Sequence, residues 1–118
     1  MPNRNLSPED RARIEHMIQA AEAALRFVAG RARSDLDEDE MLGFAVVRAI
    51  EIVGEAASKV SSAGRQATAD IVPWQLIISM RNRVVHAYFD IEPDIVWKTA
   101  LDELPDLLPK LRTLLSHN

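Results

Sequence analysis

The spacing of apolar residues predicts a helix near the start of the chain. Five apolar residues recur at steps of four and three, so they share one helical face: Ile14, Ile18, Ala21, Leu25 and Val28. Ser7 precedes Pro8, the order expected for an N-cap followed by the first helical residue. Gly30 follows the last apolar position and favours a stop. The pattern therefore predicts a helix from about Pro8 to about residue 29.

A second helix is predicted from the acidic run at residues 35–40 to about Val60. Its apolar side contains Met41, Phe44, Ala45, Val47, Ile52, Val53 and Ala56. The acidic run has the residue types of a cation site, but clustered acids are also what a helix N-terminus favours. We prefer the helix-terminus interpretation and expect no metal site.

Two further helices are predicted in the second half of the chain. The sequence at residues 61–64 breaks the pattern, and residues 71–74 then open a third helix with Pro73 near its first turn. A fourth helix is predicted to begin at Pro93. Pro105 and Pro109 remove backbone donors within it, so we expect it to be kinked or broken there.

No strand-like alternation, internal repeat or glycine-rich phosphate loop occurs in the sequence. We therefore predict an all-α protein, an antiparallel four-helix up-and-down bundle, in which residues 1–118 form a single domain. Trp74 and Trp97 are flanked by aliphatic residues, which favours a packing role over stacking on nucleic-acid bases.

Composition limits the possible functions. The chain of 118 residues has no cysteine, which excludes disulfides, thiolate zinc sites and cysteine nucleophiles. Its net charge of −4 argues against a general polyanion binder, and we expect no DNA partner. No segment is predicted to be a leader or to cross a membrane, so we expect a soluble, cytoplasmic protein.

The candidate chemistry lies in the segment Arg81-Asn82-Arg83-Val84-Val85-His86-Ala87-Tyr88. An arginine offers a planar fork of donors for phosphate, and a histidine can exchange a proton near neutral pH. Beside an RNA 2′-hydroxyl, which is itself a nucleophile, these two groups could support transesterification without a metal. Asn82 could hold the imidazole or a phosphate oxygen, Arg83 could add phosphate affinity, and Tyr88 could donate or accept a hydrogen bond. The plainer alternative is that these residues cap a helix end.

Helical geometry separates the two principal groups. Arg81 and Tyr88 are seven residues apart and share one face, whereas Asn82 and His86 share the adjacent face. Arg81 and His86 diverge by about 140° on a continuous helix. One pocket that uses both requires the helix to end near His86, or a second copy of the motif across a symmetric dimer.

Arg48 is a charged residue among aliphatic ones. It can lie with its stem along the core edge and its head near Glu51 or Glu55, or it can act near the motif. Both interpretations remain open from the sequence, and we count Arg48 among the supporting site residues.

The motif resembles the R-x-x-x-x-H-x-Y motif of the HepT-like branch of HEPN proteins, toxins of two-gene toxin-antitoxin modules. Flanking stretches that also resemble it are residues 47–56, residues 71–74, Phe89 and residues 94–97. The resemblance implies an all-helical homodimer that forms a metal-independent endoribonuclease cleft, needs no cofactor, and uses Arg81 and His86 for catalysis. It also implies a type VII module with an MntA-like minimal nucleotidyltransferase as antitoxin, which silences the toxin by AMPylation of the motif tyrosine, here Tyr88.

Two other functions remain open from the sequence. The chain could be a non-hydrolytic HEPN subunit that serves as binding partner and AMP acceptor of a nucleotidyltransferase. It could also be a purely structural helical dimerisation module.

Overall fold

The computed structural model describes residues 6–89 and 92–116. Within these residues every regular element is a helix and no strand is present, so the predicted all-α class is confirmed. The elements, in chain order, are α1 (Pro8–Val28), α2 (Asp35–Glu38), α3 (Glu40–Ser58), α4 (Ser62–Ala67), α5 (Trp74–Phe89), α6 (Pro93–Lys98), the π-helical turn η1 (Thr99–Glu103) and α7 (Leu104–Ser116).

Helix α1 begins and ends as its sequence predicts. The backbone N–H of Asp10 donates to the Ser7 hydroxyl at 3.0 Å, which makes Ser7 the N-cap. Gly30 follows the helix with φ 73°, a left-handed conformation that glycine adopts without a steric penalty.

The predicted second helix is interrupted at Asp39. This residue is extended, with φ −115° and ψ 95°, and its side chain accepts from the Leu42 N–H at 3.1 Å. It therefore ends α2 and caps α3, because an aspartate at an N-cap satisfies an otherwise unpaired donor. Arg31 forms ion pairs with both Asp35 and Asp39 at this junction between α2 and α3. Its hydrogen bond to Asp39 is the largest cause that lowers the pKa of that carboxyl below its usual value. The described residues hold no cluster of potential metal ligands.

The sequence did not predict α4. Ser61, placed in a break by the pattern, is the N-cap of this short helix and accepts from the Gly64 N–H at 3.0 Å. Asp10 of α1 accepts from both the backbone N–H and the hydroxyl of Ser61. The start of α4 is therefore tied to the first turn of α1.

Helix α5 begins at Trp74, directly after Pro73, as predicted. Trp74 is buried, and its indole N–H donates to the Thr68 hydroxyl at 3.0 Å. Trp97 is half-buried and packs against the same core. The predicted packing role of both tryptophans is confirmed.

The C-terminal helical segment is irregular before Pro105. The N–H of Leu104 bonds the carbonyl of Thr99, five residues earlier, which is the π-helical spacing. Helix α7 then continues through Pro109, so the helix is not broken at that residue, and a kink there stays a prediction. Both prolines are exposed, and water can bond the carbonyl groups that they leave unpaired.

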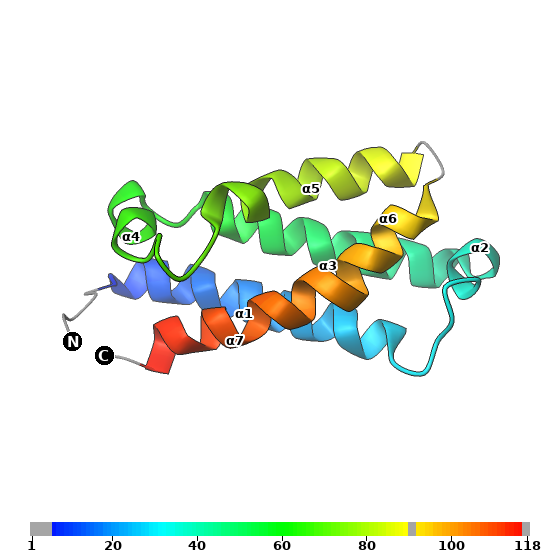
Figure 1. Cartoon of the computed structure of the whole chain (residues 1–118), viewed down its shortest axis with the longest axis horizontal. Coiled ribbons are helices and arrows are strands. Elements are labelled where there is room, and N and C mark those ends of the chain that lie inside the picture. Colours follow the sequence, from blue (N-terminus) through cyan, green and yellow to red (C-terminus); the bar gives the residue numbers. More distant parts are fainter. Residues whose placement is uncertain (1–5, 90–91, 117–118) are drawn as a thin grey trace.

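Helix α3 lies between α1 and α5 and packs against both, while α7 packs against α1. The chain reverses direction from α1 to α3 and again from α3 to α5 (Figure 1). The core contains the inner faces of these helices, with Ile14, Met17, Ile50, Ile77, Leu104 and Leu111 among its largest fully buried side chains. Among the described helices, none is long and apolar enough to span a bilayer. The motif at residues 81–88 lies within α5, beside α3.

Candidate active site on helix α5

Arg81 is positioned by a close approach between α3 and α5. A Cβ atom built on Gly54 of α3 would lie 2.8 Å from the Arg81 Cβ and 3.2 Å from the Arg81 backbone nitrogen. These distances are shorter than an ordinary carbon contact of about 3.5–4.0 Å. The absence of a side chain at Gly54 is therefore what allows α5 to place Arg81 against α3.

The Arg81 guanidinium faces two carboxylates of α3. Its Nε lies 3.6 Å from Glu55 Oε1, and its Nη2 lies 3.9 Å from Glu51 Oε2. Its Nη1 donates to the Asn82 side-chain oxygen at 3.0 Å. The side chain is still 43% exposed, so a ligand in solution can reach it.

Arg48 joins the same group of charges from α3. Its Nη1 donates to Glu55 Oε1 at 3.3 Å. Glu55 thus contacts both Arg48 and Arg81. Arg48 therefore pairs with a carboxylate, as one interpretation of the sequence predicted. It also lies near the motif arginine, as the other interpretation requires.

His86 lies on a different side of α5. It is exposed and lines a shallow surface hollow with Asn82, Arg83, Val85 and Phe89. The shared face predicted for Asn82 and His86 is confirmed. Helix α5 continues past His86 to Phe89, so a single chain presents its arginine toward α3 and its histidine in this hollow.

Arg83 is engaged with the C-terminal helical segment. Its two terminal nitrogens lie 3.2 and 3.4 Å from the Glu103 carboxylate oxygens. The Thr99 hydroxyl also approaches that carboxylate, at 3.3 Å. These contacts join α5 to η1, which gives Arg83 a structural role.

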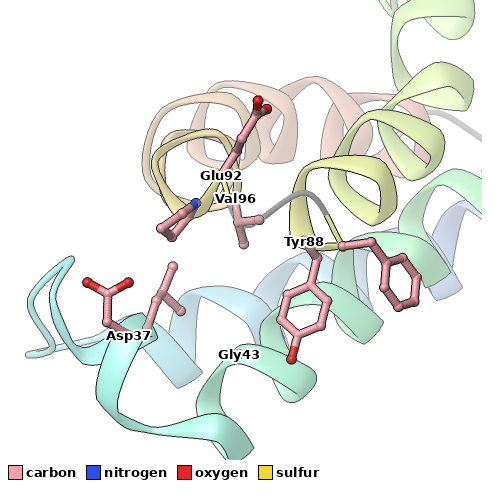
Figure 2. A pocket seen from close by; sticks show the side chains of 8 residues that line it. Asp37, Gly43, Tyr88, Glu92 and Val96 are labelled. Carbon is pink, nitrogen blue, oxygen red and sulfur yellow. The ribbon is translucent and has the colours of Figure 1, made fainter.

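Tyr88 packs over the first half of α3. A Cβ atom on Gly43 would lie 3.4 Å from the Tyr88 ring, and the Phe44 and Phe89 ring centroids lie 5.6 and 6.0 Å from it. The Tyr88 ring forms one wall of a cavity of about 330 Å³, whose other walls come from α2, α3 and α6 (Figure 2). Asp37 and Glu92 also line this cavity.

Two residues predicted on the buried side of the second helix are instead exposed. Met41 is 78% exposed and Phe44 is 54% exposed, and Phe89 at the end of α5 is 77% exposed. The Tyr88 ring lies next to the rings of both Phe44 and Phe89, so these three side chains make an apolar surface beside the motif. Exposed apolar groups in contact with one another are typical of an interaction surface.

Comparison with known proteins identifies the family. The family model described as Ribonuclease HepT-like matches residues 17–114. The chain belongs to this HepT-like family. Relatives include "Putative RNase TTE0752" of Caldanaerobacter subterraneus subsp. tengcongensis, 34% identical over 86% of this chain and 90% of that protein. "Probable ribonuclease HepT" of Thermococcus cleftensis is 32% identical over 86% of this chain and 91% of that protein. No solved structure matches the chain significantly.

Glu55 is the residue beside Arg81 that the sequence did not assign to the motif of this HepT-like chain. The sequence offered it as a partner for Arg48, but its contact with Arg81 crosses from α3 to α5. A carboxylate seven residues after Arg48, within a mainly apolar stretch of the helix that also contains Glu51, was the available signal. The register between the two helices was needed to interpret it.

Proposed function

We propose that this chain is a metal-independent endoribonuclease and the toxin of a type VII, HepT/MntA-like toxin-antitoxin module. The observation that carries the proposal is the exposure of Arg81 and His86 on one helix of a HepT-like protein. The names of its relatives support an activity on RNA. We further propose that residues 1–118 form one domain, with the antiparallel four-helix up-and-down bundle of HEPN proteins, and that it acts in the cytoplasm on RNA and not on DNA.

The proposed reaction is an internal transesterification of RNA. His86 takes the proton of a 2′-hydroxyl, whose oxygen attacks the adjacent phosphorus. The bond from phosphorus to the 5′-oxygen breaks, and that oxygen receives a proton, which leaves a 2′,3′-cyclic phosphate and a 5′-hydroxyl. Arg81 stabilises the charge that develops on the phosphoryl oxygens, a role suited to its fixed fork of donors.

A homodimer completes this site in the proposal. Within one protomer Arg81 faces α3, whereas His86 lies in the hollow on another side of α5. A twofold axis can bring the arginine of one copy to the histidine of the other, and it supplies a second histidine as the general acid. The exposed rings of Phe44 and Phe89 support an interface at this surface.

We propose that Tyr88 is the acceptor through which an MntA-like nucleotidyltransferase silences the toxin. The tyrosine oxygen forms a bond to the α-phosphorus of ATP, pyrophosphate leaves, and the phenolic proton passes to solvent. The half-buried ring of Tyr88 in the cavity wall supports this role, because an attached nucleotide would fill space beside the motif. Its negative phosphate would repel RNA.

The second candidate is a non-hydrolytic HEPN subunit that binds a nucleotidyltransferase and accepts AMP. The pairing of each motif arginine with carboxylates favours it, since Arg81 faces Glu51 and Glu55 while Arg83 faces Glu103. The net charge of −4 points the same way.

The experiment that separates the two candidates uses purified protein whose Tyr88 is shown by mass spectrometry to be unmodified. The protein is incubated with cellular RNA in EDTA, beside Arg81→Ala and His86→Ala. We expect cleavage by the wild type and a loss of at least about a hundredfold in each variant, with unchanged folding. Both side chains are accessible, so their removal should leave the core intact. An inactive wild type would instead support the binding subunit, and loss of activity in EDTA alone would refute metal independence.

A further inference from the structure

Two arginines from different helices meet at one carboxylate oxygen. Arg48 of α3 lies 3.3 Å from Glu55 Oε1, and Arg81 of α5 lies 3.6 Å from the same atom. Two guanidinium groups that share one oxygen as a partner must lie near each other. Their mutual repulsion opposes this arrangement, and the carboxylate between them offsets it.

The orientation of Arg81 is held at several points. Its Nε faces Glu55, its Nη2 faces Glu51 at 3.9 Å, and its Nη1 donates to Asn82 at 3.0 Å. Each terminal nitrogen of an arginine carries two hydrogens, so these contacts leave donors for another ligand. These contacts therefore fix the orientation of the Arg81 guanidinium and still leave N–H groups that can bind a ligand.

Exposure decides which groups a ligand meets first. The side chains of Arg48 and Arg81 are 59% and 43% exposed, whereas those of Glu55 and Glu51 are 37% and 20% exposed. Arg48 is more exposed than either carboxylate, and Arg81 is exposed to about the same extent as Glu55. A phosphate that approaches from solvent can therefore reach both guanidinium groups.

We propose that Glu55 is a positioning residue of the ribonuclease, whose carboxylate holds Arg81 and Arg48 side by side so that both contact one RNA phosphate. This inference rests on the proposed function. Glu55 itself touches no reacting atom. Its effect passes through the two arginines, because a preorganised pair of cations stabilises transition-state charge without reorganising during the reaction.

The test compares two substitutions of Glu55 in the full-length protein, with the cleavage of a defined RNA followed in EDTA. Glu55→Gln keeps the size of the side chain but removes its charge. Glu55→Asp keeps the charge but shortens the reach by one methylene. We expect kcat to fall by about tenfold to a hundredfold in Glu55→Gln, with KM within about threefold of the wild type. Glu55→Asp should also lose kcat, because the shorter side chain cannot reach both arginines.

Glu22→Gln is the matched control. It removes an ion pair of 2.7 Å between Glu22 of α1 and Arg112 of α7, at comparable exposure and away from the motif. It should leave kcat and KM unchanged. This variant reports what the loss of any surface carboxylate does to the protein, and thermal unfolding of all three variants reports their folding.

The outcomes separate the inference from the proposed function. A wild type that does not cleave RNA overturns both. An active wild type with unchanged kcat in Glu55→Gln overturns the positioning role alone. A lower KM with unchanged kcat shows instead that Glu55 competes with phosphate, and normal kinetics in Glu55→Asp show that charge matters rather than reach. Either result contradicts the inference. If Glu55→Gln unfolds, the Glu55→Asp result decides.

Discussion

Replacement of Gly54 by alanine tests the helix contact that positions Arg81. The new Cβ would lie 2.8 Å from the Arg81 Cβ and 3.2 Å from its backbone nitrogen. The two helices must separate by about 1 Å to restore an ordinary carbon contact. Overpacking of this kind costs about 1–3 kcal/mol, and the helix propensity of alanine returns about 1 kcal/mol. Because one clash is with backbone, we take the upper part of the range and expect a net loss of about 1–2 kcal/mol.

Gly43→Ala is the internal control, since Gly43 lies on the same helix and also faces α5. Its Cβ would lie 3.4 Å from a Tyr88 ring carbon, an ordinary contact with a side chain that can adjust. We expect this variant to gain up to about 1 kcal/mol from helix propensity. Urea unfolding at constant m-value measures both changes. If Gly54→Ala were as stable as Gly43→Ala, the close approach of the helices would not be the reason for the glycine, and the reasoning would be refuted.

Two further predictions concern charged residues outside the motif. Asp10 is 5% exposed and accepts two hydrogen bonds from Ser61, so Asp10→Ala should cost about 2–3 kcal/mol in urea unfolding, and wild-type stability would contradict the link between α1 and α4. Arg31→Met should raise the Asp39 pKa toward its usual value, as followed by NMR titration. Because the folded pKa is depressed, the stabilisation from Asp39 is present above the unfolded value of about 3.9 and is lost as pH falls through the folded value. An unchanged Asp39 titration in Arg31→Met would contradict the assigned cause.

Local signals predicted the positions where helices begin, because capping depends on neighbouring residues. Ser7 with Pro8 and Pro73 with Trp74 marked the starts of α1 and α5 correctly. The same logic applied to Asp39 would have found the interruption before α3, but the six-residue acidic run concealed which acid is the cap. Helix α4 escaped notice because a helix of six residues has no apolar period to detect.

The C-terminal segment shows the limit of interpreting proline alone. Proline removes a donor, but the carbonyl left unpaired can bond to water where the helix surface is exposed. Pro109 therefore lies inside α7, whereas Pro105 closely follows the irregular hydrogen bonding of η1, which contains residue 101, the acceptor four residues earlier that the Pro105 nitrogen cannot bond. Tertiary contacts of that turn, such as the pairing of Glu103 with Arg83, could not be inferred from the local sequence.

The motif itself was predictable to the level of helix faces and no further. The rotation of about 100° per residue along a helix correctly placed the Arg81 and His86 side chains on different faces of α5. The contact of Arg81 with Glu55 depends on how α3 and α5 are aligned, and that alignment is set by the space left at Gly54. A pattern within one helix carries no information about the register of its neighbour.

The charges of this surface bear on how an acidic protein can act on RNA. Arg48 and Arg81 are matched by Glu51 and Glu55, so the group has no net charge and cannot attract a polyanion at long range. In the proposed reaction this group acts at short range, where two oriented guanidinium groups would meet the charge that develops on one phosphate. Differential stabilisation of that charge raises kcat, whereas general attraction to RNA raises affinity alone. A HepT-like nuclease built in this way would bind most RNA weakly and would depend on the second copy, facing His86 to Arg81, to turn brief encounters into cleavage.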